Sequence, residues 1–276
     1  MEARLTNYIN GVFQPPVNNK YIPNINPVDG KTISLIPEST SDDVSQAVAA
    51  ANDALARPDW NHACISVKQR SEWLIKIADG IEARVDQFAL AESLDCGKPI
   101  TRAKNVDIMR AVANFRYFAQ IGANFHSDCN PSEAGGFNYT DRRPVGVVGL
   151  ITPWNLPLYL LTWKVAPALM MGNAIVAKPS ELTPSTASLL AQLCHDIGLP
   201  KGVFNIVHGN GLRAGQPLVE HRKVSAISFT GGTYTGAIVA SSAGRTFKKL
   251  SLELGGKNPN VIFADCDLER AVETAV

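Results

Sequence analysis

The chain has 276 residues, of which 45% are hydrophobic and 18% charged, so it can bury a sizeable core as one large domain or two smaller ones. Its formal net charge of +1 at pH 7 gives no general attraction for nucleic acid or for an acidic membrane surface, and we expect neither as a partner. The N-terminus has no signal-peptide core and no uninterrupted apolar run is long enough to span a bilayer, so the cytoplasm is the expected location.

The cysteines and histidines do not predict a cross-link or a metal site. The five cysteines are odd in number, widely scattered and without a Cys-x-x-Cys spacing, which argues against a disulfide framework and against zinc. The histidines likewise show no spacing that favours a metal. We therefore expect reduced thiols and no metal, with Cys194 buried in a helix beside an exposed His195.

The N-terminal half is predicted to be mostly helical after a short hairpin. Asn10-Gly11 is a favoured pair for a type I′ turn, and apolar residues flank it. Ser41 to Asp43 are expected to cap a helix that runs to about Ala56, with acidic residues in its first turn. Further helices are predicted over residues 67–84, 86–96 with Gly97 as the stop, and 101–122.

A different rhythm begins after residue 134. Residues 135–144 mix extended-type residues with turn formers and predict a strand pair that projects from the body. From residue 145, β-rich runs (145–151, 174–177, 203–207, 226–229 and 250–252) alternate with helical runs (162–171, 184–197 and 232–242). This alternation predicts an α/β fold, a Rossmann-like parallel sheet with flanking helices.

Polar and glycine residues follow each predicted strand. They are Trp154-Asn155, residues 178–181, residues 209–211, Gly231-Gly232 and Glu253. Because ligands bind at the carboxyl ends of the strands in open parallel sheets, we expect one cleft to gather them.

Glu253 stands between Leu252 and Leu254 and precedes two glycines. Its carboxylate is expected to be partly desolvated, which suits a poised base. The alternative is a strand-end carboxylate that Lys248, Lys249 or Lys257 neutralises.

Four stretches together resemble the NAD(P)-dependent aldehyde dehydrogenase family, in the order that the family has them. They are Ile151-Thr-Pro-Trp-Asn-Leu-Pro157, Lys178-Pro-Ser-Glu181, Phe229-Thr-Gly-Gly-Thr-Tyr-Thr-Gly236 and Ser251-Leu-Glu-Leu-Gly-Gly-Lys257. The resemblance covers nearly the whole chain, and residues 154–164 are similar to the branch of the family that oxidises 2-aminomuconic semialdehyde. It implies a small-molecule aldehyde substrate, NAD as cofactor, and homo-oligomers of a full-length chain joined in part by the projecting strands.

The resemblance also implies a domain boundary and two catalytic residues. Residues 1–252 would form the N-terminal and NAD-binding domain, and residues 253–276 would begin a catalytic domain. Glu253 would activate the water that hydrolyses a cysteine thioester. Asn155 would donate from its side-chain amide to the aldehyde oxygen, although an Asn beside a proline is also common in ordinary turns.

The family's nucleophilic cysteine lies in a loop beyond the glutamate, and the sequence ends at Val276 before such a loop. Cys266 is expected to be structural, because a strand predicted over residues 260–263 would carry it to the sheet end away from the cleft. We therefore expect this chain alone to be inactive. The alternative function is a truncated fragment that binds NAD or pairs with a full-length subunit.

The expected cofactor site combines two glycine turns with one carboxylate. Gly231 to Gly236, between a strand and a helix, would hold the pyrophosphate, and residues 209–215 would line the adenine side. Glu181 would accept hydrogen bonds from the ribose hydroxyls and repel the extra phosphate of NADP, although it also reads as an ordinary helix-entry residue. The full set of expected contacts is Ile151, Thr152, Pro153, Trp154, Lys178, Ser180, Glu181, Gly211, Gly215, Phe229, Thr230, Gly231, Gly232, Gly236, Leu254 and Gly255.

Overall fold

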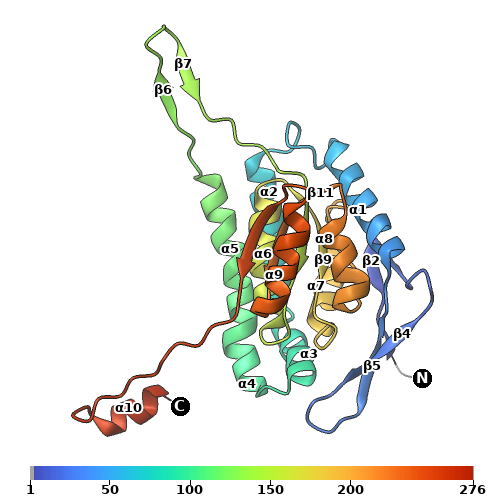
Figure 1. Cartoon of the computed structure of the whole chain (residues 1–276), viewed down its shortest axis with the longest axis vertical. Coiled ribbons are helices and arrows are strands. Elements are labelled where there is room, and N and C mark those ends of the chain that lie inside the picture. Colours follow the sequence, from blue (N-terminus) through green and yellow to red (C-terminus); the bar gives the residue numbers. More distant parts are fainter. Residues whose placement is uncertain (1–2, 276) are drawn as a thin grey trace.

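The computed structural model describes residues 3–275 and is built on one central sheet (Figure 1). Its strands are β2 (Asn7–Ile9), β3 (Val12–Gln14), β8 (Val147–Ile151), β9 (Ala174–Lys178), β10 (Phe204–Ile206), β11 (Val224–Thr230) and β12 (Lys249–Glu253). They lie in the order β12-β11-β8-β9-β10-β2-β3. The five strands from β8 to β12 are parallel, which confirms the predicted parallel sheet, and β2 joins β10 in antiparallel register.

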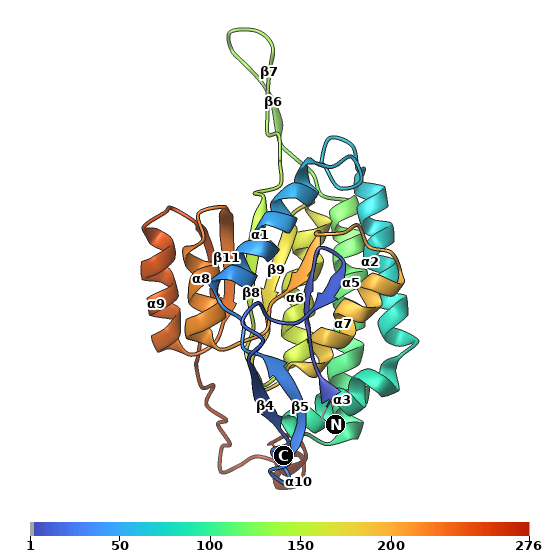
Figure 2. The ribbon, with the colours of Figure 1, turned by 90° about the vertical axis from the view of Figure 1, so that its right-hand side faces the viewer.

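Helices cover both faces of this sheet (Figure 2). One face carries α1 (Ser41–Ala56), α8 (Gln216–Glu220) and α9 (Thr233–Gly244). The other carries α6 (Pro157–Met170) and α7 (Ser185–Asp196), against which α2 (Val67–Glu82), α3 (Val85–Cys96) and α5 (Met109–Ala123) pack. The Rossmann-like architecture expected from the alternating pattern is therefore present.

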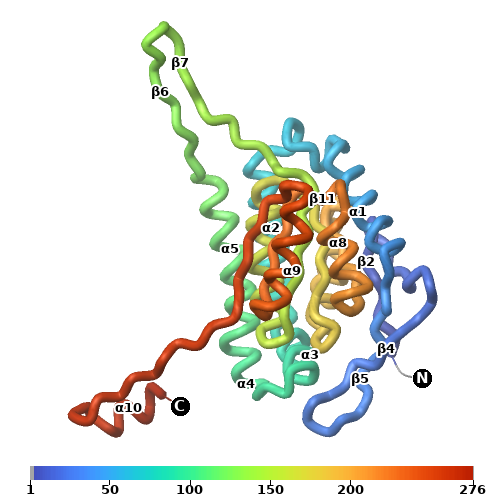
Figure 3. The backbone as a smooth tube through the Cα atoms, in the orientation of Figure 1, coloured from blue at the N-terminus to red at the C-terminus, as the bar shows by residue number. Residues whose placement is uncertain are grey.

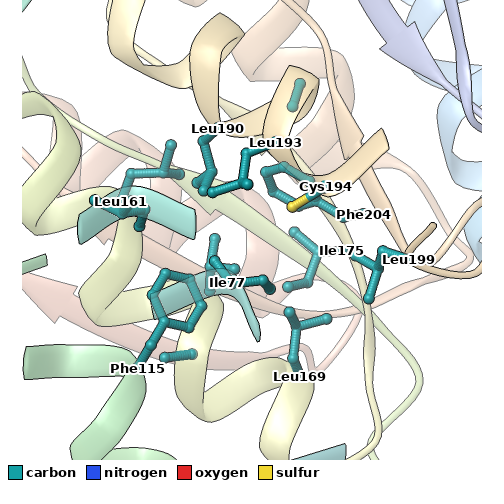
Figure 4. Packing of buried hydrophobic residues seen from close by; sticks show 14 of the residues in the cluster. Ile77, Phe115, Leu161, Leu169, Ile175, Leu190, Leu193, Cys194, Leu199 and Phe204 are labelled. Carbon is teal, nitrogen blue, oxygen red and sulfur yellow. The ribbon is translucent and has the colours of Figure 1, made fainter. Parts of the chain in front are cut away.

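The sheet is buried from both sides, as a parallel sheet requires. Along β9, Ile175 and Ala177 pack with the α6–α7 side, whereas Ala174 and Val176 pack with the α1 side. Figure 4 shows the first of these clusters, in which Leu161, Leu169 and Leu190 from α6 and α7 surround Ile175 together with Ile77 and Phe115. Successive side chains on a strand point to opposite faces, so one continuous apolar run supplies two cores.

The opening hairpin forms as predicted. Asn10 and Gly11 have φ of 53° and 76°, the left-handed conformation that both central residues of a type I′ turn need. A separate three-stranded sheet follows from β1 (Ala3–Arg4), β4 (Tyr21–Ile25) and β5 (Thr32–Pro37), in the order β1-β5-β4.

The helix caps correct one prediction. The N-cap of α1 is Thr40, one residue before the predicted Ser41, because the Asp43 carboxylate accepts from the Thr40 backbone N–H at 2.9 Å. Gly97 ends α3 as predicted, with a left-handed φ of 70°.

The helix predicted over residues 101–122 is interrupted, since α4 (Ile100–Arg102) leads into a π-helical segment, η1 (Ala103–Ile108), before α5.

The projecting strand pair is real but begins earlier than predicted. It consists of β6 (Cys129–Pro131) and β7 (Phe137–Tyr139), which extend from the body as a narrow hairpin. The expected range of 135–144 therefore contained only the second strand.

The last segment also differs from the prediction. Residues 260–263 form no strand in the part of the chain that the structure describes, and the backbone runs away from the body to α10 (Leu268–Ala275) (Figure 3). The described chain also contains no helix with the length and apolar character needed to cross a lipid bilayer.

Candidate active site

The carboxyl ends of β8, β9, β11 and β12 bring the predicted site segments together. In the sheet, β8 lies between β9 and β11, so the connections from β8 to β9 and from β9 to β10 run in the opposite sense from the connection of β11 to β12. In open α/β sheets ligands bind at such a switch point, outside the carboxyl ends of the strands, and we call this place in the chain the crevice. Two backbone hydrogen bonds tie the segments to each other, from Thr152 N to Lys178 O at 3.3 Å and from Gly231 N to Glu253 O at 3.1 Å.

The sixteen predicted cofactor contacts divide by exposure. Buried positions are Ile151, Thr152, Lys178, Ser180, Gly215, Phe229 and Gly236, and partly exposed ones are Pro153, Glu181, Thr230 and Gly231. Trp154, Gly211, Gly232, Leu254 and Gly255 are exposed. The solvent-facing residues therefore come from four different connections.

Residues 152–156, which we call the β8–α6 loop, carry Trp154 and Asn155 at the surface. The backbone carbonyl of Asn155 accepts a hydrogen bond from Lys98 Nζ at 3.2 Å. The Cys96 thiol donates to the carbonyl of Trp154 at 3.4 Å. The loop is thus held through its backbone, which leaves the Asn155 side-chain amide facing solvent.

Residues 179–184, the β9–α7 loop, carry Ser180 and Glu181. Glu181 Oε2 lies 2.9 Å from the buried Lys178 Nζ, in an i,i+3 ion pair at the end of β9. Ser180 Oγ accepts from Leu182 N at 3.2 Å, which fixes the turn. Only about a third of the Glu181 side chain is exposed, at 35%, and one of its carboxylate oxygens is paired with Lys178.

The turn from β11 into α9 leaves the backbone at the start of the helix accessible to a ligand. Gly232 is the N-cap of α9, and within residues 3–275 no side chain caps this helix. The first backbone N–H groups of α9, which have no intrahelical partner, therefore point outward with the positive end of the helix dipole. A Cβ at Gly236 would collide with the Leu254 side chain, and one at Gly255 would lie 3.6 Å from Thr233 Oγ1.

The second predicted glycine turn is a capped π-helical segment, η2 (Gly211–Gly215). The Asn210 side chain accepts from Arg213 N at 2.9 Å, so side-chain capping already uses one N–H here. A Cβ at Gly215 would lie 3.6 Å from Lys178 Cδ, which places this segment against the β9 end. Gly211 is exposed beside it.

Glu253 is the last residue of β12 and the register partner of Thr230. It is exposed, so the expected desolvation was wrong. The alternative was also wrong, because among residues 3–275 Glu253 forms no ion pair with a lysine, and Lys248 Nζ donates instead to the carbonyls of His221 and Val224. In this chain Glu253 is a solvent-accessible carboxylate at the rim of the crevice.

Sequence reasoning missed a lysine that shares a groove with Glu253. A groove of about 640 Å³ between α6 and the sheet is lined by Tyr159, Trp163, Lys164, Ser228, Thr230 and Glu253, among others. Lys164 Nζ donates to Ser228 Oγ at 2.9 Å, and burial lowers the pKa of Lys164 to about 8. The sequence did contain a signal for this lysine, because Lys164 is the one charged residue in the stretch that forms α6.

The thiols occupy different environments. Cys194 is buried in α7 beside an exposed His195, as predicted, and its burial raises the thiol pKa. Cys96 touches the β8–α6 loop, but burial and the nearby Glu92 carboxylate raise its pKa to about 12. Cys266 is exposed in the turn before α10, and the strand that was expected to carry it away from the cleft is not there.

Comparisons with known proteins agree with this geometry. Residues 13–276 match the sequence profile of the aldehyde dehydrogenase family. The 2-aminomuconic semialdehyde dehydrogenase of Danio rerio is 50% identical over 273 residues, which are 99% of this chain and 55% of that protein. The 2-hydroxymuconic semialdehyde dehydrogenase of a Pseudomonas species is 45% identical, over 98% of this chain and 56% of that protein.

A solved NAD⁺ complex of an aldehyde dehydrogenase from Bacillus cereus has the same fold. It superposes with a TM-score of 0.95 at 37% identity, over 99% of this chain and 55% of that chain. The chain thus spans about half the length of the curated relatives it matches. The predicted resemblance to the semialdehyde-oxidising branch is confirmed by these relatives.

Proposed function

This chain belongs to the aldehyde dehydrogenase family, and from that premise we propose that it provides the NAD-binding part and the general base for oxidation of a semialdehyde to a carboxylic acid. One observation carries the proposal. The backbone hydrogen bond from Gly231 N to Glu253 O, at 3.1 Å, joins the glycine turn that would hold the pyrophosphate to the residue whose carboxylate would activate water, which supports one shared site.

Several features of the crevice fit NAD. The uncapped first turn of α9 offers N–H groups to a pyrophosphate, and Gly232 keeps the approach open. Glu181, which is partly exposed, would accept hydrogen bonds from the ribose hydroxyls through the carboxylate oxygen that Lys178 leaves unpaired. When bound, NAD would supply the hydride acceptor. The chain's own residues would hold and orient it.

The aldehyde would meet two groups of this chain. The Asn155 side-chain amide would donate to the aldehyde oxygen, on which negative charge develops. It stands on a loop whose backbone is held by a hydrogen bond from Lys98. Glu253 would take a proton from the attacking water and pass it to solvent, to which it is exposed. Tyr159 and Trp163 give the groove an aromatic wall on the α6 side, which suits an unsaturated acyl chain.

We propose that none of the five thiols of this chain acts as the nucleophile. Cys266 lies on the segment that runs away from the body to α10 (Figure 3), so the course of this segment, and not a strand, keeps it apart from the candidate site. The thiol that lies against the β8–α6 loop, Cys96, has a raised pKa and already donates its hydrogen to a carbonyl, so little thiolate forms at neutral pH. We therefore propose that the chain alone binds NAD without steady turnover. The cytoplasmic location and the domain boundary at residue 252 stay predictions from the sequence.

The β6–β7 hairpin favours subunit pairing as a second role. It projects from the body and exposes Phe137 and Tyr139 at 74% and 75%. Two large aromatic side chains on a narrow exposed hairpin are typical of an interaction site.

Titration calorimetry with NAD and a continuous NADH assay with semialdehydes test the main proposal together. We expect NAD to bind and no steady NADH to form. Gly232→Asp should abolish binding, because it places a carboxylate where the pyrophosphate would lie. Absence of NAD binding to the unaltered chain would overturn the cofactor assignment, whereas steady NADH formation that Cys96→Ser removes would overturn the assignment of the thiols.

A further inference from the structure

Helix α3 carries two buried carboxylates that each reach a different helix. Glu92 and Asp95 are 0% and 4% exposed and lie three residues apart, on the same face of α3. Neither belongs to the crevice. Burial of an unpaired carboxylate is costly, so each requires partners, and the partners lie at the starts of α6 and α7.

Glu92 acts on α6. Its Oε2 accepts a hydrogen bond from Leu158 N at 3.3 Å, in the first turn of that helix. Within the described chain the N-cap residue Leu156 makes no side-chain cap hydrogen bond, and Pro157 has no N–H to satisfy. Glu92 therefore supplies from another helix the capping acceptor that α6 lacks.

Asp95 does the same for α7. Its Oδ2 accepts from Ser185 N at 2.8 Å and its Oδ1 from Ser185 Oγ at 2.9 Å. The N-cap residue Pro184 makes no side-chain cap hydrogen bond in the residues that the structure covers. Asn24 Nδ2 also donates to Oδ1, at 2.9 Å, and so helps to hold the Asp95 carboxylate in place.

Lys98 completes the arrangement. Its Nζ has three hydrogens and three acceptors, namely Asp107 Oδ2 at 2.6 Å, Asn155 O at 3.2 Å and Glu92 Oε1 at 3.5 Å. Asp107 projects from the π-helical segment η1, a rare conformation that is frequent at functional sites. One ammonium thereby links the carboxylate that caps α6 to the backbone of the residue that bears the proposed oxyanion donor.

The two capped helices follow the two loops of the candidate site. The β8–α6 loop carries Asn155 and the β9–α7 loop carries Glu181. We propose that Glu92, Asp95 and Lys98 are positioning residues, a double cap that sets the β8–α6 loop through Glu92 and Lys98 and the β9–α7 loop through Asp95. The roles of Asn155 and Glu181 rest on the proposed function, whereas the setting of the loops does not.

Hydrogen exchange of the 276-residue chain, followed by mass spectrometry, separates the two halves of the cap. Glu92→Ala should speed exchange in residues 154–161 on the order of tenfold and leave residues 181–188 unchanged. Asp95→Ala should do the reverse. Glu92→Gln and Asp95→Asn, which keep an acceptor and the side-chain volume, should restore most of the protection and cover the case in which an alanine variant fails to fold.

Asp86→Ala is the matched control, since Asp86 is a carboxylate of the same helix in an exposed ion pair with Lys104. It should change neither loop. Equal acceleration of both loops by either variant, or acceleration spread over the whole chain, would overturn the proposal in favour of a general stabilising role. Unchanged exchange in the alanine variants would overturn it as well.

A binding measurement connects the cap to the proposed function. Asp95→Ala should weaken NAD binding several-fold by calorimetry, and Glu92→Ala should weaken it less, because the β9–α7 loop carries Glu181, the proposed acceptor for the ribose hydroxyls, whereas the β8–α6 loop carries only the expected contacts of residues 152–154. If the exchange pattern holds but the unaltered chain does not bind NAD, the double cap stands and the proposed function fails. If NAD binds but the two variants affect it equally, the assignment of one loop to each carboxylate fails.

Discussion

Lys178 and Glu181 form an ion pair of 2.9 Å at the end of β9, in which the lysine side chain is almost fully buried and the glutamate side chain is 35% exposed. The carboxylate therefore neutralises a buried ammonium. In the proposed function it would also accept hydrogen bonds from the ribose of NAD.

We predict that Glu181→Gln narrows the preference for NAD over NADP. The amide removes the charge that repels the 2′-phosphate and frees the Lys178 ammonium to attract it. The ratio of the dissociation constant for NADP to that for NAD, measured by calorimetry, should be on the order of tenfold smaller in the variant than in the unaltered chain. Equal affinity of the unaltered chain for NAD and NADP would contradict the prediction.

Lys164 should make the unfolding free energy depend on pH in the alkaline range. Its pKa is lowered from 10.5 to about 8, mainly by burial, while Glu253 acts in the opposite direction. Between these values the unfolded chain binds more protons than the native one, so this contribution raises stability as pH rises from about 8 to 10.5. The effect is at most about 3 kcal/mol.

Lys164→Met isolates that contribution. Below pH 8 the variant should be the more stable protein, because it replaces a buried charge with an apolar chain of similar length. The advantage should shrink toward pH 10.5, as measured by urea unfolding at both ends of the range. An advantage that does not change with pH would show that Lys164 keeps an ordinary pKa.

Glu92 should make the unfolding free energy depend on pH in the acidic range, and there the free energy should fall as pH rises. Burial is the largest cause that raises its pKa from 4.5 to about 7, and the charged groups that face it are Lys98, which lowers the pKa, and Asp107, which raises it. Lys98 Nζ lies closer to Asp107 than to Glu92, so Glu92 receives only part of its charge.

The native chain therefore holds a proton on Glu92 that the unfolded chain has lost, and this contribution to stability falls as pH rises from 4.5 through 7, by at most about 3 kcal/mol. The stability difference between Glu92→Gln and the unaltered chain should change over this window and level off above it. A constant difference between pH 4.5 and pH 7 would refute the assignment.

Gly97→Ala should destabilise the chain by about 1 kcal/mol or more. Gly97 ends α3 at φ of 70°, and a Cβ there would lie 3.0 Å from Pro27 Cγ, so alanine meets both backbone strain and a close contact. Gly244→Ala is the control, since this helical glycine ends α9 without a positive φ and a Cβ there meets nothing within 4 Å in the described structure. It should be neutral or stabilising in the same thermal unfolding measurement.

Local patterns predicted the elements well because their causes are local. Asn10-Gly11 determines its own turn, and the alternating runs after residue 145 give the parallel strands that place Asn155, Glu181 and Gly231 at one edge. The exposure of Glu253 was not predictable in this way, since it depends on what packs beside β12 rather than on Leu252 and Leu254.

The double cap shows the other limit of sequence reasoning. Glu92 and Leu158 are 66 residues apart, and Asp95 and Ser185 are 90 apart, so no spacing or periodicity joins them. In the sequence, Glu92 and Asp95 look like ordinary polar residues of a helix. The remaining signal was that no side chain able to cap a helix directly precedes Pro157 or Ser185. The first N–H groups of those two helices therefore need an acceptor from elsewhere in the chain.

The position of β12 at the edge of the sheet has a consequence for the timing of chemistry. Within residues 3–275, β12 is hydrogen-bonded on one side only, to β11, and Glu253 is its last residue. Strand ends held from one side fray more often than those held from two. The Glu253 carboxylate, our proposed base, would then be in register only during the fraction of time that the strand end is closed. A polypeptide that adds to the open edge would lengthen that fraction, so the availability of the proposed base would follow the occupancy of a neighbouring strand.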